Sequence, residues 1–288
     1  MTEIFQQQRD RLFGIAYRML GSRSEAEDVL QDAWLRWSSA DIDDIHEPAA
    51  WLTTVVTRLS LDQLRRVKQQ RLDYIGPWLP EPLVTESAEA PDVLLELADD
   101  LSLAFLAVLE RLSPEERAAY LLREVFDTPY SEVAGILNKQ EAACRKLVSR
   151  ARERVQAERP RYTVDADTHR DVLQRFADAM QSGDAADLLA LLHPEVEMIS
   201  DGGGKVIAAL RVLRGAERVL RLYRAVARRT PPGVMNWRVG LANGQPALFQ
   251  YVGRRLESIV TIVHDGQRIH SIYNIRNPDK LPATEKSH

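Results

Sequence analysis

The stretch from Tyr130 to Val155, YSEVAGILNKQEAACRKLVSRARERV, predicts a short helix, a tight turn and a longer helix that is rich in cations. Ser131 is the expected N-cap of the first helix, and Asn138 can adopt the left-handed conformation that such a turn often needs. These features indicate a helix-turn-helix, whose second helix enters the DNA major groove while its cations contact phosphates. A basic surface helix in an ordinary bundle would give the same local pattern. The side chains expected to face inward are Val133, Ala134, Ile136, Leu137, Ala143, Cys144, Leu147, Val148 and Ala151.

The formal net charge of −4 conceals an uneven distribution of charge along the chain. Residues 51–72 carry five cations against one acid, and residues 131–161 carry eight cations against four acids. Residues 1–50 carry five cations against ten acids, and residues 73–130 carry three against 13. Two basic blocks on either side of an acidic segment suggest two contacts with DNA, joined by a spacer that does not touch it.

The chain has 288 residues, which is enough for two or three domains with separate cores. Its single cysteine excludes an internal disulfide and favours a reducing compartment. The N-terminus lacks the pattern of a signal peptide, and no apolar run approaches the length of a membrane span. We therefore expect a cytoplasmic protein that does not enter membranes, with no metal and no cofactor.

Residues 1–72 predict a small bundle of three helices, with apolar residues at helical spacing in each. Ser24 with Glu27 indicates a capping box at the start of the second helix, and Pro48 suits the first turn of the third helix.

Residues 73–91 contain four prolines and no helical period, which indicates a stiff linker. Its WLPEP segment carries a large apolar ring, Trp78, that we expect to dock against another part of the chain. Residues 92–160 predict a second bundle of four helices, with a capping box from Ser113 to Glu116, ending in the helix-turn-helix.

Residues 163–288 predict an α+β domain. Two amphipathic helices are followed by a strand, the turn DGGGK and a third, arginine-rich helix that ends near Arg229. Asn243-Gly244 and Asp265-Gly266 are strong hairpin signals between strands. The expected elements are helices at His169–Ser182 and Ala185–Leu192, and strands at Glu195–Ile199, Met235–Leu241, Ala247–Arg254, Leu256–Val263 and Arg268–Ile275.

The first 160 residues resemble an RNA polymerase sigma factor of the extracytoplasmic-function group. EAEDVLQDAWLRW resembles the region-2 helix that holds core polymerase, PAAWLTTVVTRLSLDQLRR the segment that opens the −10 promoter element, and SPEERAAY to SRARERV the region-4 domain that reads the −35 element. Residues 163–288 resemble a SnoaL-like or ketosteroid-isomerase-like cone. The whole chain therefore resembles the subgroup with a fused SnoaL-like extension, which shares the marks WLPEP, DGGGK, NGQPA and NPDKL.

The resemblance implies a fold of two all-α bundles followed by an α+β cone, and a set of binding residues without catalysis. Core polymerase would contact Asp28, Gln31, Asp32 and Arg36. The −10 element would contact Trp51, Arg58, Arg65, Arg66, Lys68 and Arg71. The −35 element would contact Lys139, Gln140, Glu141, Arg145, Lys146, Arg150, Arg152 and Arg154. Interdomain regulation would involve Trp78, Leu79, Pro80, Glu81, Pro82, Asp201, Lys205, Asn243, Gly244, Gln245, Asn277, Asp279 and Lys280.

One of these assignments has an alternative, and the turn before the recognition helix departs from the usual sequence. Trp51 is either a wall for an unpaired base, held by stacking, or a core residue. The turn at Asn138-Lys139-Gln140 replaces the Gly-Ile/Val-Ser of most such factors, so the N-cap of the recognition helix is weaker than usual.

The C-terminal domain admits other functions. We expect a built-in regulator that packs on the WLPEP linker, and it can also bind a small molecule. A rival is an enzyme fused to a DNA-binding module, with Asp201, His193, His264 or His270 as a pocket base. A third possibility is a one-component repressor with a ligand-binding cone. The triple glycine of DGGGK lacks the spacing of a phosphate-binding loop.

Overall fold

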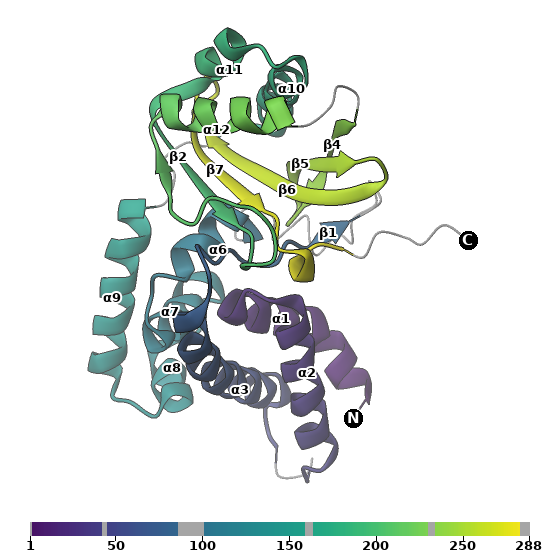
Figure 1. Cartoon of the computed structure of the whole chain (residues 1–288). Helices are drawn as coiled ribbons and strands as arrows, with labels where there is room; N and C mark the ends of the chain where they lie inside the picture. Colours follow the sequence, from purple (N-terminus) through teal and green to yellow (C-terminus); the bar gives the residue numbers. More distant parts are fainter. Residues whose placement is uncertain (1, 42–44, 86–100, 159–163, 230–233, 283–288) are drawn as a thin grey trace. The chain divides into compact units, whose positions relative to one another are not determined.

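The computed structural model describes residues 2–41, 45–85, 101–158, 164–229 and 234–282. It divides into two compact units, one formed by residues 1–72 with 105–159 and the other by residues 73–104 with 160–288 (Figure 1). The two helical segments thus lie in one unit, and the proline-rich linker belongs to the unit of the C-terminal domain. Among the described helices, none combines the length and apolar character needed to cross a membrane.

The first unit is helical and has two groups of helices. Helices α1 (Thr2–Leu20), α2 (Arg23–Ser38) and α3 (Pro48–Gln70) pack together around fully buried side chains that include Leu12, Trp37 and Leu52. Helices α6 (Leu103–Leu109), α7 (Pro114–Tyr120), α8 (Tyr130–Leu137) and α9 (Glu141–Glu158) form the other group, with a π-helical turn at Leu121–Val125.

Local signals explain two helix ends in this unit. The Ser113 hydroxyl accepts from the Glu116 N–H while the Glu116 carboxylate accepts from the Ser113 N–H, so the predicted capping box is confirmed. Asn138 ends α8 with φ of 52°, as the tight turn of the helix-turn-helix needs. Cys144 is buried, as predicted.

Three local predictions are wrong. Helix α8 begins at Tyr130 with Pro129 as its N-cap, so Ser131 already lies inside the helix and cannot cap it. Helix α2 begins at Arg23 with Ser22 at its N-cap position, two residues before Ser24, which therefore lies inside the helix. Ala143 is exposed, because the buried stripe of α9 runs through Cys144, Leu147, Val148, Ala151 and Val155.

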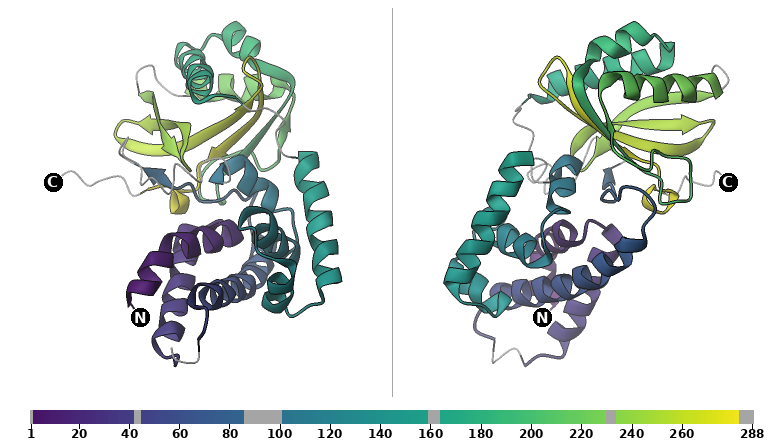
Figure 2. Two further views of the ribbon diagram at one scale, coloured as in Figure 1. Left: turned by 180° about the vertical axis from the view of Figure 1, so that it is seen from behind. Right: turned by 60° about the vertical axis from the view of Figure 1, so that its left-hand side comes forward.

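In its described residues, the second unit contains a curved sheet of seven strands in the order β1-β4-β5-β6-β7-β2-β3, in which β2 and β7 run parallel and the other neighbours antiparallel. A layer of helices covers one face of the sheet (Figure 2). The helices are α10 (Ala166–Ser182), α11 (Ala185–Leu191) and α12 (Ala216–Arg229). The strands are β1 (Val84–Thr85), β2 (Leu192–Asp201), β3 (Leu213–Arg214), β4 (Met235–Ala242), β5 (Gln245–Val252), β6 (Arg255–His264) and β7 (Ile269–Ile275).

The core of this unit lies between the helices and the sheet, with Phe176 and Val219 from the helices against Leu248 and Ile272 from the strands. The hairpin at Asn243-Gly244 is confirmed, with φ of 55° and 73° at its two turn residues. The α+β character of the C-terminal domain is confirmed as well. The sheet goes beyond the prediction by gaining β1 from the linker, whose Val84 pairs with Ala242.

Candidate functional site

The face of α2 predicted to hold a protein partner is open. Asp28, Gln31, Asp32 and Arg36 are all exposed, at a spacing that places them on one side of the helix. Leu35 lies among them and is 57% exposed, although the sequence did not mark it as a surface residue. An apolar side chain within a ring of charges is typical of a protein-binding surface.

Two cations of α3 that were predicted to contact DNA, Arg58 and Lys68, donate hydrogen bonds within the first unit. The Arg58 guanidinium donates to the carbonyls of Gly135 (2.8 Å) and Ile136 (2.9 Å) at the end of α8. Lys68 donates to the carbonyls of Glu110 (3.2 Å) and Leu112. In this conformation these side chains hold α3 to the second group of helices.

The remaining cations of this segment, Arg65 and Arg66 on α3 and Arg71 directly after it, differ in their partners. Arg65 contacts Glu115 at 3.1 Å, a half-exposed pair that contributes little to stability. Arg71 is mostly buried and contacts Glu110 at 2.7 Å. For Arg66, which is exposed, the described part of the chain provides neither a hydrogen bond nor an ion pair.

A buried charge cluster lies beneath this contact. Arg117 is fully buried and contacts Glu110 at 2.6 Å, while its guanidinium also donates to the carbonyls of Met19 (2.8 Å) and Leu109 (2.9 Å). Burial alone would raise the pKa of Glu110, but the charges of Arg117 and Arg71 outweigh it and hold that pKa below its ordinary value. Sequence reasoning missed this cluster, because nothing local distinguishes Arg117 from the chain's many exposed arginines.

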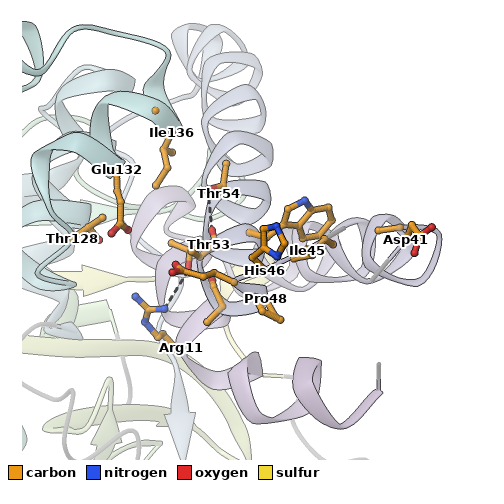
Figure 3. Close-up of a pocket in the computed structure, with 16 residues that line it drawn as sticks. Arg11, Asp41, Ile45, His46, Pro48, Thr53, Thr54, Thr128, Glu132 and Ile136 are labelled. Atoms are coloured by element: carbon orange, nitrogen blue, oxygen red, sulfur yellow. Dashed lines mark hydrogen bonds between the residues drawn. The ribbon is translucent and has the colours of Figure 1, made fainter. Parts of the chain in front are cut away.

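Trp51 lines a cavity of about 1020 Å³ in the first unit, between α1, the start of α3 and α8 (Figure 3). Arg11 donates to the Thr53 hydroxyl at 3.1 Å across its floor. The Trp51 ring also lies 5.5 Å from that of Trp37, which is fully buried. Trp51 therefore has both a core neighbour and access to a cavity. Stacking of an unpaired base on the Trp51 ring stays a prediction.

The cations of α9, and of the turn that precedes it, lie near acids of the group of helices that runs from α6 to α9. Lys139 contacts Glu115 at 3.1 Å, and Arg145 stacks on the Tyr130 ring at 4.2 Å. Three further arginines pair with carboxylates: Arg152 with Glu124 at 2.8 Å, and Arg150 and Arg154 with Glu116 at 3.5 and 2.8 Å. Gln140, Glu141 and Lys146 are exposed. The arginine side chains of these pairs are half-exposed or more, so their guanidinium groups stay accessible to phosphates, although the Glu116 carboxylate is buried.

Asp201 of the DGGGK turn organises the linker. Its carboxylate is fully buried and accepts from the Tyr74 hydroxyl (2.6 Å), the Leu79 N–H (2.8 Å) and the Lys280 ammonium (2.7 Å). The Gly203 N–H donates to the same carboxylate at 3.1 Å. A buried carboxylate needs such partners, and here four groups from three segments supply them.

Aromatic contacts complete this linker joint, by which we mean the contacts of Tyr74, Trp78 and Leu79 with Asp201 and Lys280. The Lys280 ammonium lies 4.0 Å from the centre of the Trp78 ring and 5.3 Å from that of Tyr74, within range of cation–π attraction. Asn277 donates to the Tyr74 hydroxyl at 2.9 Å. The expected docking of Trp78 is therefore realised within this unit. Tyr74 is the member that the sequence did not single out.

The other predicted interdomain residues surround the same joint. Leu79, Pro80 and Pro82 are buried and Glu81 is half-buried, while Lys205 pairs with Asp279. Asn243 accepts from the Leu83 N–H at 3.0 Å and donates to its carbonyl at 2.8 Å. Gly244 and Gln245 form the turn and the first residue of β5.

The glycines of DGGGK are explained by close packing. Gly203 has φ of 60°, and a Cβ there would lie 2.5 Å from Nδ2 of Asn277. Gly204 has φ of 70°, and its Cβ would lie 2.8 Å from the Ile75 side chain. Both positions need glycine for conformation and for space, which agrees with the absence of a phosphate-loop pattern.

The candidate pocket bases do not converge on a cavity in the described residues. Asp201 is committed to the linker, and the rings of His193 and His270 stack at 4.3 Å. The Gly266 N–H donates to Nδ1 of His264, so Nε2 of His264 donates to His169 at 2.8 Å. Burial lowers the pKa of His264 to about 4, aided by the neighbouring His169.

Comparison with known proteins matches all three parts of the chain. Residues 4–71 match the sigma-70 region 2 family, residues 102–155 the sigma-70 region 4 family, and residues 173–277 the SnoaL-like domain family.

Similar proteins match over almost the whole length. The chain is 39% identical to the ECF RNA polymerase sigma factor SigJ of Mycobacterium tuberculosis, covering 97% of this chain and 93% of that protein. It is 31% identical to the probable ECF sigma factor SigI of the same species, covering 95% and 92%. The crystal structure of SigJ superimposes with a TM-score of 0.79 at 38% identity, covering 97% of this chain and 98% of the other.

Proposed function

Since the chain belongs to the extracytoplasmic-function RNA polymerase sigma factors, we propose that the exposed face of α2 holds core RNA polymerase. The full-length similarity to SigJ carries this proposal, together with the open face formed by Asp28, Gln31, Asp32 and Arg36. Leu35 at its centre supplies the apolar anchor that such interfaces use. The protein would act in the cytoplasm, where the polymerase is.

We assign the promoter contacts to two helices, α3 and α9. The cations of α3, with Trp51, would open and hold the −10 element, and α9 with the preceding turn would read the −35 element. Gln140, Glu141, Arg145 and Lys146 are the candidate base contacts, and Arg150, Arg152 and Arg154 the phosphate contacts.

The conformation described here would be a closed state of the first unit. Arg58, Lys68 and Arg71 are engaged with α8 and with the segment around Glu110, so the second group of helices occupies these candidate contacts with the −10 element. Binding of polymerase would favour an open state in which these cations reach DNA. The C-terminal domain, which binds the linker through Asp201, would regulate that opening.

A titration of the full-length protein against core polymerase tests the first proposal. Asp28→Ala/Asp32→Ala is expected to weaken binding at least about tenfold, a loss of about 1.4 kcal/mol. Asp171→Ala/Asp178→Ala, which removes two exposed acids from α10, is the matched control and should bind like the wild type. Equal binding by both variants would overturn the assignment of the α2 face.

Glu110→Gln tests the closed state, because it removes the buried charge that Arg71 and Arg117 contact and leaves every candidate DNA contact in place; thermal unfolding is the control that the variant, with Arg117 unpaired, stays folded. We expect a larger radius of gyration in solution scattering and tighter binding of promoter duplex. An unchanged radius with unchanged affinity would rule the closed state out.

The alternative hypothesis, in which the C-terminal domain is an enzyme, requires a buried carboxylate that faces a tyrosine or histidine across a cavity. The described residues offer no such pair, since Asp201 serves the linker. We therefore do not propose a catalytic role for the C-terminal domain.

A further inference from the structure

Helix α12 of the C-terminal domain has two faces of opposite character. It packs on β2 in the layer of helices (Figure 1), and its inward side chains Val219, Leu220 and Tyr223 are buried in the core. The charged residues of this helix are five arginines and one acid, Glu217, and all six are exposed. We call the five arginines the arginine face of α12: Arg218, Arg221, Arg224, Arg228 and Arg229.

The arginine face is not neutralised within the described part of the chain. There, none of its guanidinium groups forms an ion pair or a hydrogen bond, whereas Arg214, just before the helix, pairs with Glu197 at 2.8 Å. From Arg218 to Arg228 the arginines follow one another at three or four positions, a spacing at which like charges repel and destabilise a helix. The helix dipole favours cations only in the last turn. A face that repels itself and meets no acid therefore indicates an anionic partner.

The rest of the helix surface selects the class of partner. A membrane-bound amphipathic helix buries its apolar face in lipid, but that face of α12 is already packed in the core. Protein interfaces depend on large apolar or aromatic anchors, and the uncharged exposed residues of α12 are Ala225 and Ala227. Contacts with a nucleic-acid backbone need only cations. These features favour phosphates over lipid and over an acidic protein.

The length of the arginine face fits duplex DNA. It runs from Arg218 to Arg229, about 16 Å along the helix axis at the usual rise per residue. One strand of a duplex presents a phosphate every 3.4 Å or so along its axis, so the face covers roughly five phosphates. The promoter-binding helices belong to the same chain and keep duplex DNA at a high effective concentration for the C-terminal domain. Even a weak contact that reads no sequence then adds to affinity.

We infer that the arginine face of α12 binds the phosphate backbone of double-stranded DNA outside the promoter elements, without reading its sequence. The inference rests on the proposed promoter binding for the presence of DNA, and it adds a contact made by the C-terminal domain. A duplex that lacks promoter elements tests it, so the result does not depend on base reading by α3 or α9.

Fluorescence anisotropy of a labelled duplex of about 30 base pairs and arbitrary sequence, titrated with the full-length protein, is the measurement. Arg218→Gln/Arg221→Gln/Arg228→Gln removes three charges and keeps helix propensity. Each phosphate contact contributes about 0.9 to the slope of log affinity against log salt concentration. Between about 50 and 200 mM KCl, we expect this variant to lower the slope by about 2.7 and to weaken binding at least about tenfold.

The matched control is Arg170→Gln/Arg175→Gln/Arg268→Gln. It removes three exposed arginines of the same domain outside α12, so the net charge changes equally. The control should keep the salt slope of the wild type. The α12 variant should also unfold at the same temperature as the wild type or higher, because repulsion between arginines is relieved. A lower unfolding midpoint with unchanged duplex binding would assign these arginines to the fold and overturn the inference.

Two further outcomes would overturn it. The first is a wild type that does not bind the duplex, or an α12 variant that binds it with the slope of the control. The second appears in a titration against core polymerase: a loss of binding by the α12 variant, with duplex binding unchanged, would assign the face to an acidic protein. Either outcome leaves the proposed contacts of α2, α3 and α9 standing, because the α12 variant changes none of their residues.

Discussion

Replacing Asp201 by asparagine should release the WLPEP linker from the C-terminal domain. The carboxylate is fully buried and accepts from Tyr74, Leu79 and Lys280 at 2.6 to 2.8 Å. The Lys280 side chain is itself only 10% exposed, so the substitution leaves a nearly buried ammonium without its counter-charge. Removing one partner of a buried ion pair costs about 3–5 kcal/mol.

Hydrogen exchange at the Leu79 amide is a direct measurement of this change, because that N–H donates to Asp201. A local cost of about 3 kcal/mol corresponds to exchange faster by about 100-fold. We expect peptides covering residues 74–83 to show this increase in Asp201→Asn. The matched control is Asp279→Asn, which breaks the exposed pair with Lys205 and should change exchange less than about fivefold.

A second variant separates the buried charge from the loss of hydrogen bonds. Lys280→Met alone leaves the Asp201 carboxylate buried without its cation, whereas Asp201→Asn/Lys280→Met leaves neither charge buried. The double variant should therefore lose less protection than the sum of the two single variants. A change below about threefold in Asp201→Asn, or strict additivity in the double variant, would refute the reasoning.

Two further predictions concern the C-terminal domain. His264 is buried and hydrogen-bonded to the half-buried His169, and burial lowers the pKa of both rings; the unfolded chain binds protons from about pH 6.5, so stability should fall from pH 6.5 to about pH 4. The full loss is about 3 kcal/mol, and thermal unfolding across this range should show it; a flat profile would contradict the lowered pKa values. Gly203→Ala should destabilise the domain by at least about 2 kcal/mol, because left-handed strain adds to a clash with Asn277. Gly253→Ala has the same φ near 60° but open space, and in denaturant titration it should cost only about 1–2 kcal/mol; equal losses would exclude the clash.

The sequence alone predicted the elements whose signals are local. The capping box at Ser113, the left-handed Asn138 and the hairpin at Asn243-Gly244 each depend on residues within a few positions of one another. The order of three family-like segments also identified the sigma factor with its SnoaL-like extension, which the comparisons confirm. The errors at Ser24 and Ser131 are shifts of two residues in helix starts, where neighbouring residues compete for the same cap.

Only the tertiary structure decided which polar groups are partners. Tyr74 and Leu79 reach Asp201 across 127 and 122 positions of the sequence, and Arg58 reaches the Ile136 carbonyl across 78. Nothing in the local sequence separates these side chains from solvated ones, because the cost of burying a charge is set by neighbours that the fold brings from elsewhere. The sequence therefore determined the domains' types and the candidate contacts. The tertiary structure decided that the linker is gripped by a buried carboxylate and that cations assigned to DNA are engaged within the protein.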